Sequence, residues 1–67
     1  MVTKAAVVSV EEMRGAAGLN SPPMFRAYYR ILKRGRKPLR YTYKWARDEL
    51  EAWMLTQEWL RERGYKV

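Results

Sequence analysis

The side chains that could do chemistry in this chain are almost all cationic or aromatic, and most of them lie between Met24 and Trp45. The chain has no Cys and no His, which removes the usual zinc ligands and the commonest general base. Its tyrosines could act as nucleophiles in principle. However, no metal-ligand group accompanies them, and a chain of 67 residues is too short to build a pocket around them. We therefore expect no enzymatic activity, no cofactor and no metal.

The charge of the chain is +7, from 14 Lys and Arg against 7 Asp and Glu, and it is unevenly distributed. Acids occur at Glu11 and Glu12 and then only from Asp48 onward, so the interval between Met13 and Trp45 holds cations without counter-charge. A polyanion is the natural partner of such a surface, because each neutralised phosphate releases a condensed counterion. A basic surface that serves only solubility is the alternative that composition leaves open.

Two helices are expected in the first half of the chain. After a short strand over 6–8, Ser9 and Glu12 form a capping box for a helix that ends at Gly18. The run 21–23, Ser-Pro-Pro, predicts the start of a second helix that extends to about Arg34. At 100° per residue this helix has an apolar face and an opposite cationic face; the apolar side chains are Met24, Phe25, Tyr28, Ile31 and Leu32, and the cations are Arg26, Arg30, Lys33 and Arg34.

A strand and a third helix are expected in the second half. Strict alternation over 39–45 predicts a strand with a core face of Leu39, Tyr41, Tyr43 and Trp45 and an exposed face of Arg40, Thr42 and Lys44; its clearest partner is 7–9. The longest helix is expected over 46–63, with acids in its first turns and a stop at Gly64. Its main apolar face holds Ala46, Leu50, Trp53, Met54 and Leu60. A second cluster, of Ala52, Leu55 and Trp59, lies on the opposite side of this helix and is a candidate self-association surface. The alternative is that the N-terminal or C-terminal end of the chain folds over it.

This order of elements predicts one winged helix-turn-helix domain over 1–67, mainly α with three helices and a small β wing. Residues 1–6 are expected to be flexible and 65–67 to form a tail. Arg26 and Arg30 are the candidates for contacts with base edges, because Arg pairs bidentately with guanine. Contacts with phosphates, or insertion of the wing into the minor groove, are expected from Ser21, Lys33, Arg34, Arg36, Lys37, Arg40 and Lys44.

Three runs, VSVEEM, AAGLNSPPMFRAYYR and ARDELEAWM, resemble the small excisionase or AlpA-like proteins of phages and mobile elements, which are relatives of the MerR-type winged helix-turn-helix. The resemblance spans about 8–54, and its most specific pieces are 18–22 and 50–53. It implies an architectural protein that binds repeated sites in double-stranded DNA, bends the DNA and steers an integrase towards excision. It also implies a role in transcription regulation and cooperative assembly on DNA as a homo-oligomer.

A protein-binding module is the main alternative function, for example a phage inhibitor whose basic face docks on an acidic host protein. RNA binding is a third option, set lower because no RNA-recognition motif is evident and the aromatics of 39–45 are expected to face the core. No apolar segment approaches the roughly 20 residues that span a bilayer, and no signal peptide is evident at the start. We therefore expect a soluble, cytoplasmic and nucleoid-associated protein.

Overall fold

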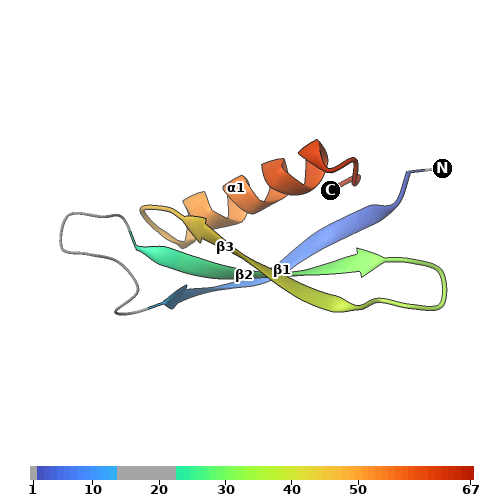
Figure 1. Ribbon diagram of the computed structural model, residues 1–67, viewed down its shortest axis with the longest axis horizontal. Helices are drawn as coiled ribbons and strands as arrows, with labels where there is room; N and C mark the ends of the chain where they lie inside the picture. Colours follow the sequence, from blue (N-terminus) through green and yellow to red (C-terminus); the bar gives the residue numbers. More distant parts are fainter. Residues whose placement is uncertain (1, 14–22) are drawn as a thin grey trace.

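Three antiparallel strands and one helix make up the computed structural model, which describes residues 2–13 and 23–67 (Figure 1). The strands are β1 (Lys4–Met13), β2 (Met24–Leu32) and β3 (Leu39–Trp45), in the sheet order β1-β2-β3. The helix α1 (Glu49–Glu62) lies across one face of this sheet (Figure 1). The described architecture is α+β, so the prediction of a mainly α winged helix-turn-helix with three helices is wrong.

The central strand β2 occupies the segment for which the groove-reading helix was predicted. Its side chains alternate, with Phe25, Ala27, Tyr29 and Ile31 buried on the helix side and Met24, Arg26, Tyr28, Arg30 and Leu32 on the other side. The mixture of apolar and cationic residues in this short segment fits a helical period and a strand period equally well. Aromatic and β-branched residues favour a strand, and β1 and β3 supply hydrogen-bonded partners on both of its edges.

The strand β1 replaces the first predicted helix over its described part. It pairs with β2 from Lys4↔Leu32 to Met13↔Met24, with an irregularity between Val7 and Ser9 that is typical of a β-bulge. The short strand expected over 6–8 is confirmed, but it is longer than predicted. Residues 4–6 belong to it, within the stretch 1–6 for which flexibility was expected. The remainder of the predicted helix and the caps at Gly18 and Ser21 fall at 14–22, outside the described residues.

The predicted strand over 39–45 is confirmed as β3, but its partner and its buried face differ from the prediction. It pairs with β2 along its length, from Met24↔Trp45 to Arg30↔Leu39, and not with 7–9. Alternate side chains of β3 face away from α1, and all four are substantially exposed: Leu39 at 51%, Tyr41 at 56%, Tyr43 at 45% and Trp45 at 49%. The expectation that these aromatics fill the core is therefore wrong.

The C-terminal helix is confirmed as α1. The Asp48 carboxylate caps it by accepting a hydrogen bond of 2.8 Å from the Glu51 N–H, and acids in the first turn complement the helix dipole. Gly64, with φ of 92°, follows the last turn in the left-handed conformation that suits glycine. The predicted apolar face is partly reversed, because Leu50 is 70% and Met54 is 54% exposed.

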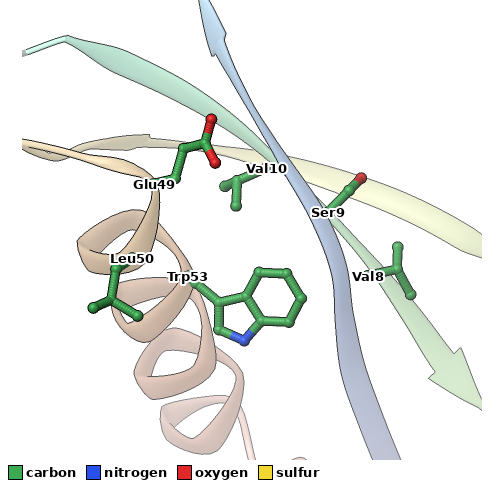
Figure 2. A pocket seen from close by; sticks show the side chains of 6 residues that line it. All are labelled: Val8, Ser9, Val10, Glu49, Leu50 and Trp53. Atoms are coloured by element: carbon green, nitrogen blue, oxygen red, sulfur yellow. The ribbon is translucent and has the colours of Figure 1, made fainter.

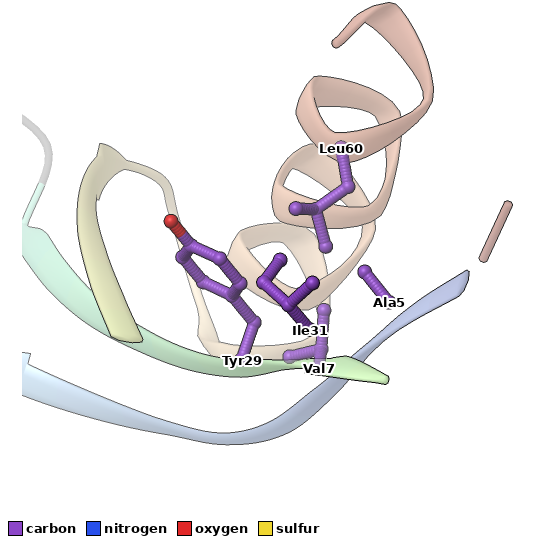
Figure 3. Packing of buried hydrophobic residues seen from close by; sticks show 5 residues of the cluster. All are labelled: Ala5, Val7, Tyr29, Ile31 and Leu60. Atoms are coloured by element: carbon purple, nitrogen blue, oxygen red, sulfur yellow. The ribbon is translucent and has the colours of Figure 1, made fainter. Parts of the chain in front are cut away.

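The core lies between α1 and the sheet and consists of two small clusters. Figure 3 shows the first cluster, in which Leu60 of α1 meets side chains of β1 and β2; its members are Ala5, Val7, Tyr29, Ile31 and Leu60. The second cluster joins Phe25, Ala46 and Ala52, with Val10 and Leu55 packed against it. Between the clusters, Thr56 is fully buried and its hydroxyl donates a 2.7 Å hydrogen bond to the Ala52 carbonyl.

The apolar cluster predicted for self-association belongs to this core. Ala52 is completely buried, Leu55 packs on the second cluster, and the Trp59 ring meets the Tyr29 ring edge-on at a centroid distance of 5.5 Å. The Lys44 ammonium and the Arg63 guanidinium each lie 4.8 Å from the centre of the Trp59 ring. These three side chains face the sheet, so they do not form the exposed surface that the sequence suggested.

Candidate nucleic-acid interface on the open face of the sheet

The sheet face opposite α1 carries no other described element and is rich in Arg and Tyr (Figure 1). We call it the open face and define it by the side chains of β2 and β3 that point away from the helix: Met24, Arg26, Tyr28, Arg30, Leu32, Leu39, Tyr41, Tyr43 and Trp45. Antiparallel pairing places Arg26 beside Tyr43, and Tyr28 beside Tyr41. Side chains directly opposite one another on neighbouring strands are close enough to interact, so the register itself assembles this cluster.

Arg26 lies at the centre of the open face and is held by tyrosines. Its Nη1 donates to the Tyr28 hydroxyl at 3.2 Å and its Nη2 to the Tyr43 hydroxyl at 3.4 Å. These hydrogen bonds, first that with Tyr28 and then that with Tyr43, raise the pKa of Arg26, so its charge is permanent. Each tyrosine oxygen accepts from the guanidinium, which leaves its own hydroxyl hydrogen to donate elsewhere. The cluster is therefore a cation with hydrogen-bond donors from β2 and β3 beside it, and its paired residue on β1 is Glu11.

The faces of two of these tyrosine rings are already in use. The Arg26 guanidinium lies 5.3 Å from the centre of the Tyr41 ring and 5.5 Å from that of Tyr43. The Tyr41 ring is edge-on to Tyr43 at 5.7 Å and tilted against Tyr28 at 6.1 Å. Cation–π contacts of this kind hold the guanidinium in place. The tyrosines thus present edges and hydroxyls outward more than free faces for stacking.

A basic hairpin continues from one end of the open face. The backbone groups of Lys33 and Arg36 exchange hydrogen bonds of 3.0 and 3.1 Å, and Gly35 makes the turn with φ of 75°. Arg30 donates from Nη1 to the Lys37 carbonyl at 2.8 Å, which ties the hairpin to the sheet. A hollow of about 410 Å³ lies beside the turn; it is lined by Lys33, Arg36, Lys37, Pro38 and Arg40.

The structure brings most of the predicted site residues together, although on different elements from those expected. Arg26 and Arg30 share the open face, and the hairpin carries Lys33, Arg34, Arg36, Lys37 and Arg40, all of them exposed. Lys44 lies apart, because its side chain packs over Trp59 on the helix side of β3, and burial there lowers its pKa. Ser21 lies outside the described residues.

The tyrosines that hold Arg26 were missed as site residues. Tyr28, Tyr41 and Tyr43 were expected in the core, because alternation shows that a strand has two faces without showing which one is covered. A signal was present nonetheless. Two alternating segments separated by the short run 33–38, with Gly35 in it, are typical of a hairpin, and hairpin pairing sets the tyrosines beside Arg26.

Other kinds of site find no support in the described part of the chain. No group of three or more His, Cys, Asp or Glu side chains gathers there in a way that could hold a metal ion. Within 2–13 and 23–67, no helix has both the length and the apolar surface needed to cross a membrane. The resemblance to excisionase or AlpA-like proteins stays a prediction. Comparison with known protein families, with characterised proteins and with solved structures finds no match to this chain.

Proposed function

We propose that this protein binds double-stranded DNA through the open face of its sheet, with the basic hairpin on the phosphates. The observation that carries the proposal is the Arg26 guanidinium, fixed by the hydroxyls of Tyr28 and Tyr43 on a sheet face that no other described element covers. A permanent cation with surrounding donors matches the acceptor-rich edge of guanine and the phosphate oxygens. The proposal is one of binding, without a catalytic step.

The dimensions of the sheet suit the major groove. Neighbouring strands lie about 4.8 Å apart, so the two strands that carry the open face, β2 and β3, form a ribbon of the kind that the major groove, about 12 Å wide, admits. Sheets and β-ribbons are established readers of DNA grooves. In this arrangement Arg26 and Arg30 reach base edges, as the sequence predicted, but from a strand. The expectation of a helix over 24–34 in the major groove, with a wing on the DNA, is withdrawn, because strand β2 occupies 24–32.

The hairpin supplies the sequence-independent part of the binding. Lys33, Arg34, Arg36 and Lys37 are all exposed in the turn that the Arg30 hydrogen bond ties to the sheet, whereas Arg40 is exposed but pairs with Tyr29 and so lies on the helix side of β3. Contacts of this kind position a protein on the duplex, and base contacts then give specificity. The architectural, recombination and regulatory roles implied by the resemblance are compatible with such a surface, and an integrase or a second copy on the DNA would be an additional partner.

Single-stranded nucleic acid is the second candidate ligand, and Trp45 is the observation that favours it. This side chain is 49% exposed, and its ring has no aromatic or cationic partner among the described residues. An exposed indole face can stack on a base of a single strand. The aromatics of β3 are exposed, which removes one of the two reasons for setting RNA binding lower; the other, that no RNA-recognition motif is evident, is unchanged. Duplex DNA ranks first because Arg26 already occupies the faces of Tyr41 and Tyr43.

A titration against matched ligands tests the proposal. A short labelled duplex, each of its single strands and an RNA of the same sequence are compared by fluorescence anisotropy between about 50 and 200 mM salt. Contact with five to seven phosphates predicts that log K for the duplex falls with log salt with a slope of roughly −4.5 to −6. If either single strand binds more tightly than the duplex, and Trp45→Ala removes that binding, then single-stranded nucleic acid and not duplex DNA is the ligand. Absence of binding to every ligand at the lowest salt would refute both.

A further inference from the structure

We propose that the groove between β1 and the first half of α1 binds an extended peptide of a partner protein that carries apolar side chains next to Lys or Arg. The groove is a separate surface from the open face, so this inference does not rest on DNA binding. It has a volume of about 440 Å³ and is lined by Val8, Ser9, Val10, Glu49, Leu50 and Trp53. Figure 2 shows the Trp53 ring and the Val10 side chain in the space between the helix and the strand.

The lining of the groove is apolar and open to solvent. Leu50 is 70% exposed and Val8 is 44% exposed, while Val10 and Trp53 are half-buried at the floor. Leaving large aliphatic side chains in water is unfavourable by about 25 cal/mol for each Å² of apolar surface. Contiguous apolar surface of this kind, bordered by charged residues, is typical of an interaction site.

The groove runs along the outer edge of a strand, which favours an extended peptide over a helix or a small molecule. β2 occupies one edge of β1, and over 6–13 the other edge has no backbone partner among the described residues. Near its start the same edge already accepts a segment in extended pairing. Lys66 lies parallel to Lys4, its carbonyl accepts from the Ala5 N–H, and its N–H donates to the Thr3 carbonyl, both at 2.9 Å. A peptide that continues this pairing adds main-chain hydrogen bonds and sends alternate side chains into the groove.

The charge around the groove selects the partner. Of the seven acids in the chain, four lie on the helix side of β1 or at the start of α1: Glu12, Asp48, Glu49 and Glu51. Glu49 lines the groove itself (Figure 2). Like charges opposite one another on paired strands are destabilising. Opposite charges on paired strands attract instead, so the acids on the groove side of β1 and at the start of α1 favour a strand that carries Lys or Arg.

A short synthetic peptide in which Lys and Val alternate, blocked at both ends, is the probe for the groove. Isothermal titration with the full chain is expected to show saturable binding of one peptide, at least tenfold tighter than binding of a peptide in which Glu and Val alternate. Amide hydrogen exchange is expected to slow in β1 over 9–13 when the Lys-Val peptide is bound. Equal affinity for the two peptides, or no binding of the Lys-Val peptide, would overturn the proposal.

Two exposed residues of α1 provide a matched pair of variants. Leu50→Lys places a charge in the groove and is expected to lower the peptide affinity at least tenfold. Met54→Lys makes the same change in charge one helical turn further on, outside the lining of the groove, and is expected to change the affinity less than twofold. Circular dichroism checks that both variants are folded. Equal losses in the two variants would contradict a specific groove.

Two further measurements separate this proposal from the others. Arg26→Gln removes the centre of the open face and is expected to leave peptide binding unchanged, so the peptide site and the DNA site can fail independently. A second copy as the occupant would give a dimer in sedimentation experiments without peptide, and Leu50→Lys would abolish that dimer. Such a result would overturn the choice of a peptide partner.

Discussion

Tyr28 and Tyr29 are neighbours in the chain, and their substitution by Ala is expected to have opposite effects. Tyr29 is 8% exposed in the core cluster between β2 and α1 (Figure 3). Its ring is edge-on to the ring of Trp59. Tyr28 lies on the open face, where its hydroxyl accepts from Arg26. We expect Tyr29→Ala to destabilise the fold and Tyr28→Ala to weaken DNA binding.

The expected magnitudes follow from the burial of each ring. Truncating a buried aromatic side chain to Ala costs about 3–5 kcal/mol. A chain of 67 residues, at about 0.05–0.15 kcal/mol per residue, has a total stability of about 3–10 kcal/mol. Tyr29→Ala therefore removes a large share of the stability. Tyr28→Ala loses a cross-strand pair of about 0.2–1 kcal/mol and should unfold with almost the wild-type midpoint.

Urea denaturation followed by tryptophan fluorescence and circular dichroism measures both effects. If Tyr29→Ala is unfolded without urea, Tyr29→Leu retains a large apolar side chain and still reports the loss of the contact with Trp59. A larger loss of unfolding free energy in Tyr28→Ala than in Tyr29→Ala would refute the assignment of 24–32 to a strand. In the helix first predicted for this segment, Tyr28 lies on the apolar face and Tyr29 at the margin of the cationic face.

Gly35→Ala is expected to destabilise the domain by about 1–2 kcal/mol with an unchanged denaturant slope, because φ at this position is 75°. Nothing lies within 4 Å of the added Cβ, so the cost comes from the backbone conformation and not from a clash. An unchanged urea midpoint would contradict the left-handed turn. Asp48→Ala is expected to cost about 1 kcal/mol, whereas Asp48→Asn costs only a few tenths, and equal losses in thermal melts would count against side-chain capping. Lys37→Ala should weaken the binding of all duplexes alike and reduce the salt slope by about 1. Arg30→Ala should lower the binding free energy at a selected site by about 1–3 kcal/mol and relax base preference there. Identical behaviour of the two variants in anisotropy titrations would rule out their separate roles.

Among the described elements, local signals were sufficient to predict β3, α1 and a short part of β1. The alternation over 39–45 predicted β3, and α1 was predicted from the acids of its first turn and from Gly64. The segment over 24–32 was assigned to a helix because the Ser-Pro-Pro run before it is typical of a helix start and because the spacing of its residues fits both periods. That prediction left β3 with only the distant segment 7–9 as a partner, which was itself a sign that a strand had been missed.

The faces of the elements could not be predicted, because burial depends on contacts between distant parts of the chain. Trp45 and Leu50 are apolar and were placed in the core, yet both are exposed. Trp45 lies on the face of the sheet that α1 does not cover, and Leu50 lies on α1 itself, on a side that the sheet does not cover. The cations of the hairpin were easier to predict, since a turn rich in Lys and Arg is exposed in almost any fold. Arg26 and Arg30 were also proposed as base-contacting residues, but the tyrosines that hold Arg26 could be recognised only from the register of β2 and β3.

The most direct test of DNA binding by the open face compares two variants with the same net charge. Arg26→Gln removes the guanidinium held by Tyr28 and Tyr43, and Arg61→Gln removes an exposed cation from the last turn of α1, on the other side of the sheet. In anisotropy titrations at fixed salt, we expect Arg26→Gln to lower duplex affinity at least tenfold, which is about 1.4 kcal/mol, and Arg61→Gln to lower it less than twofold. Equal losses in the two variants would mean that net charge alone drives the binding, and would contradict the assignment of the interface to the open face.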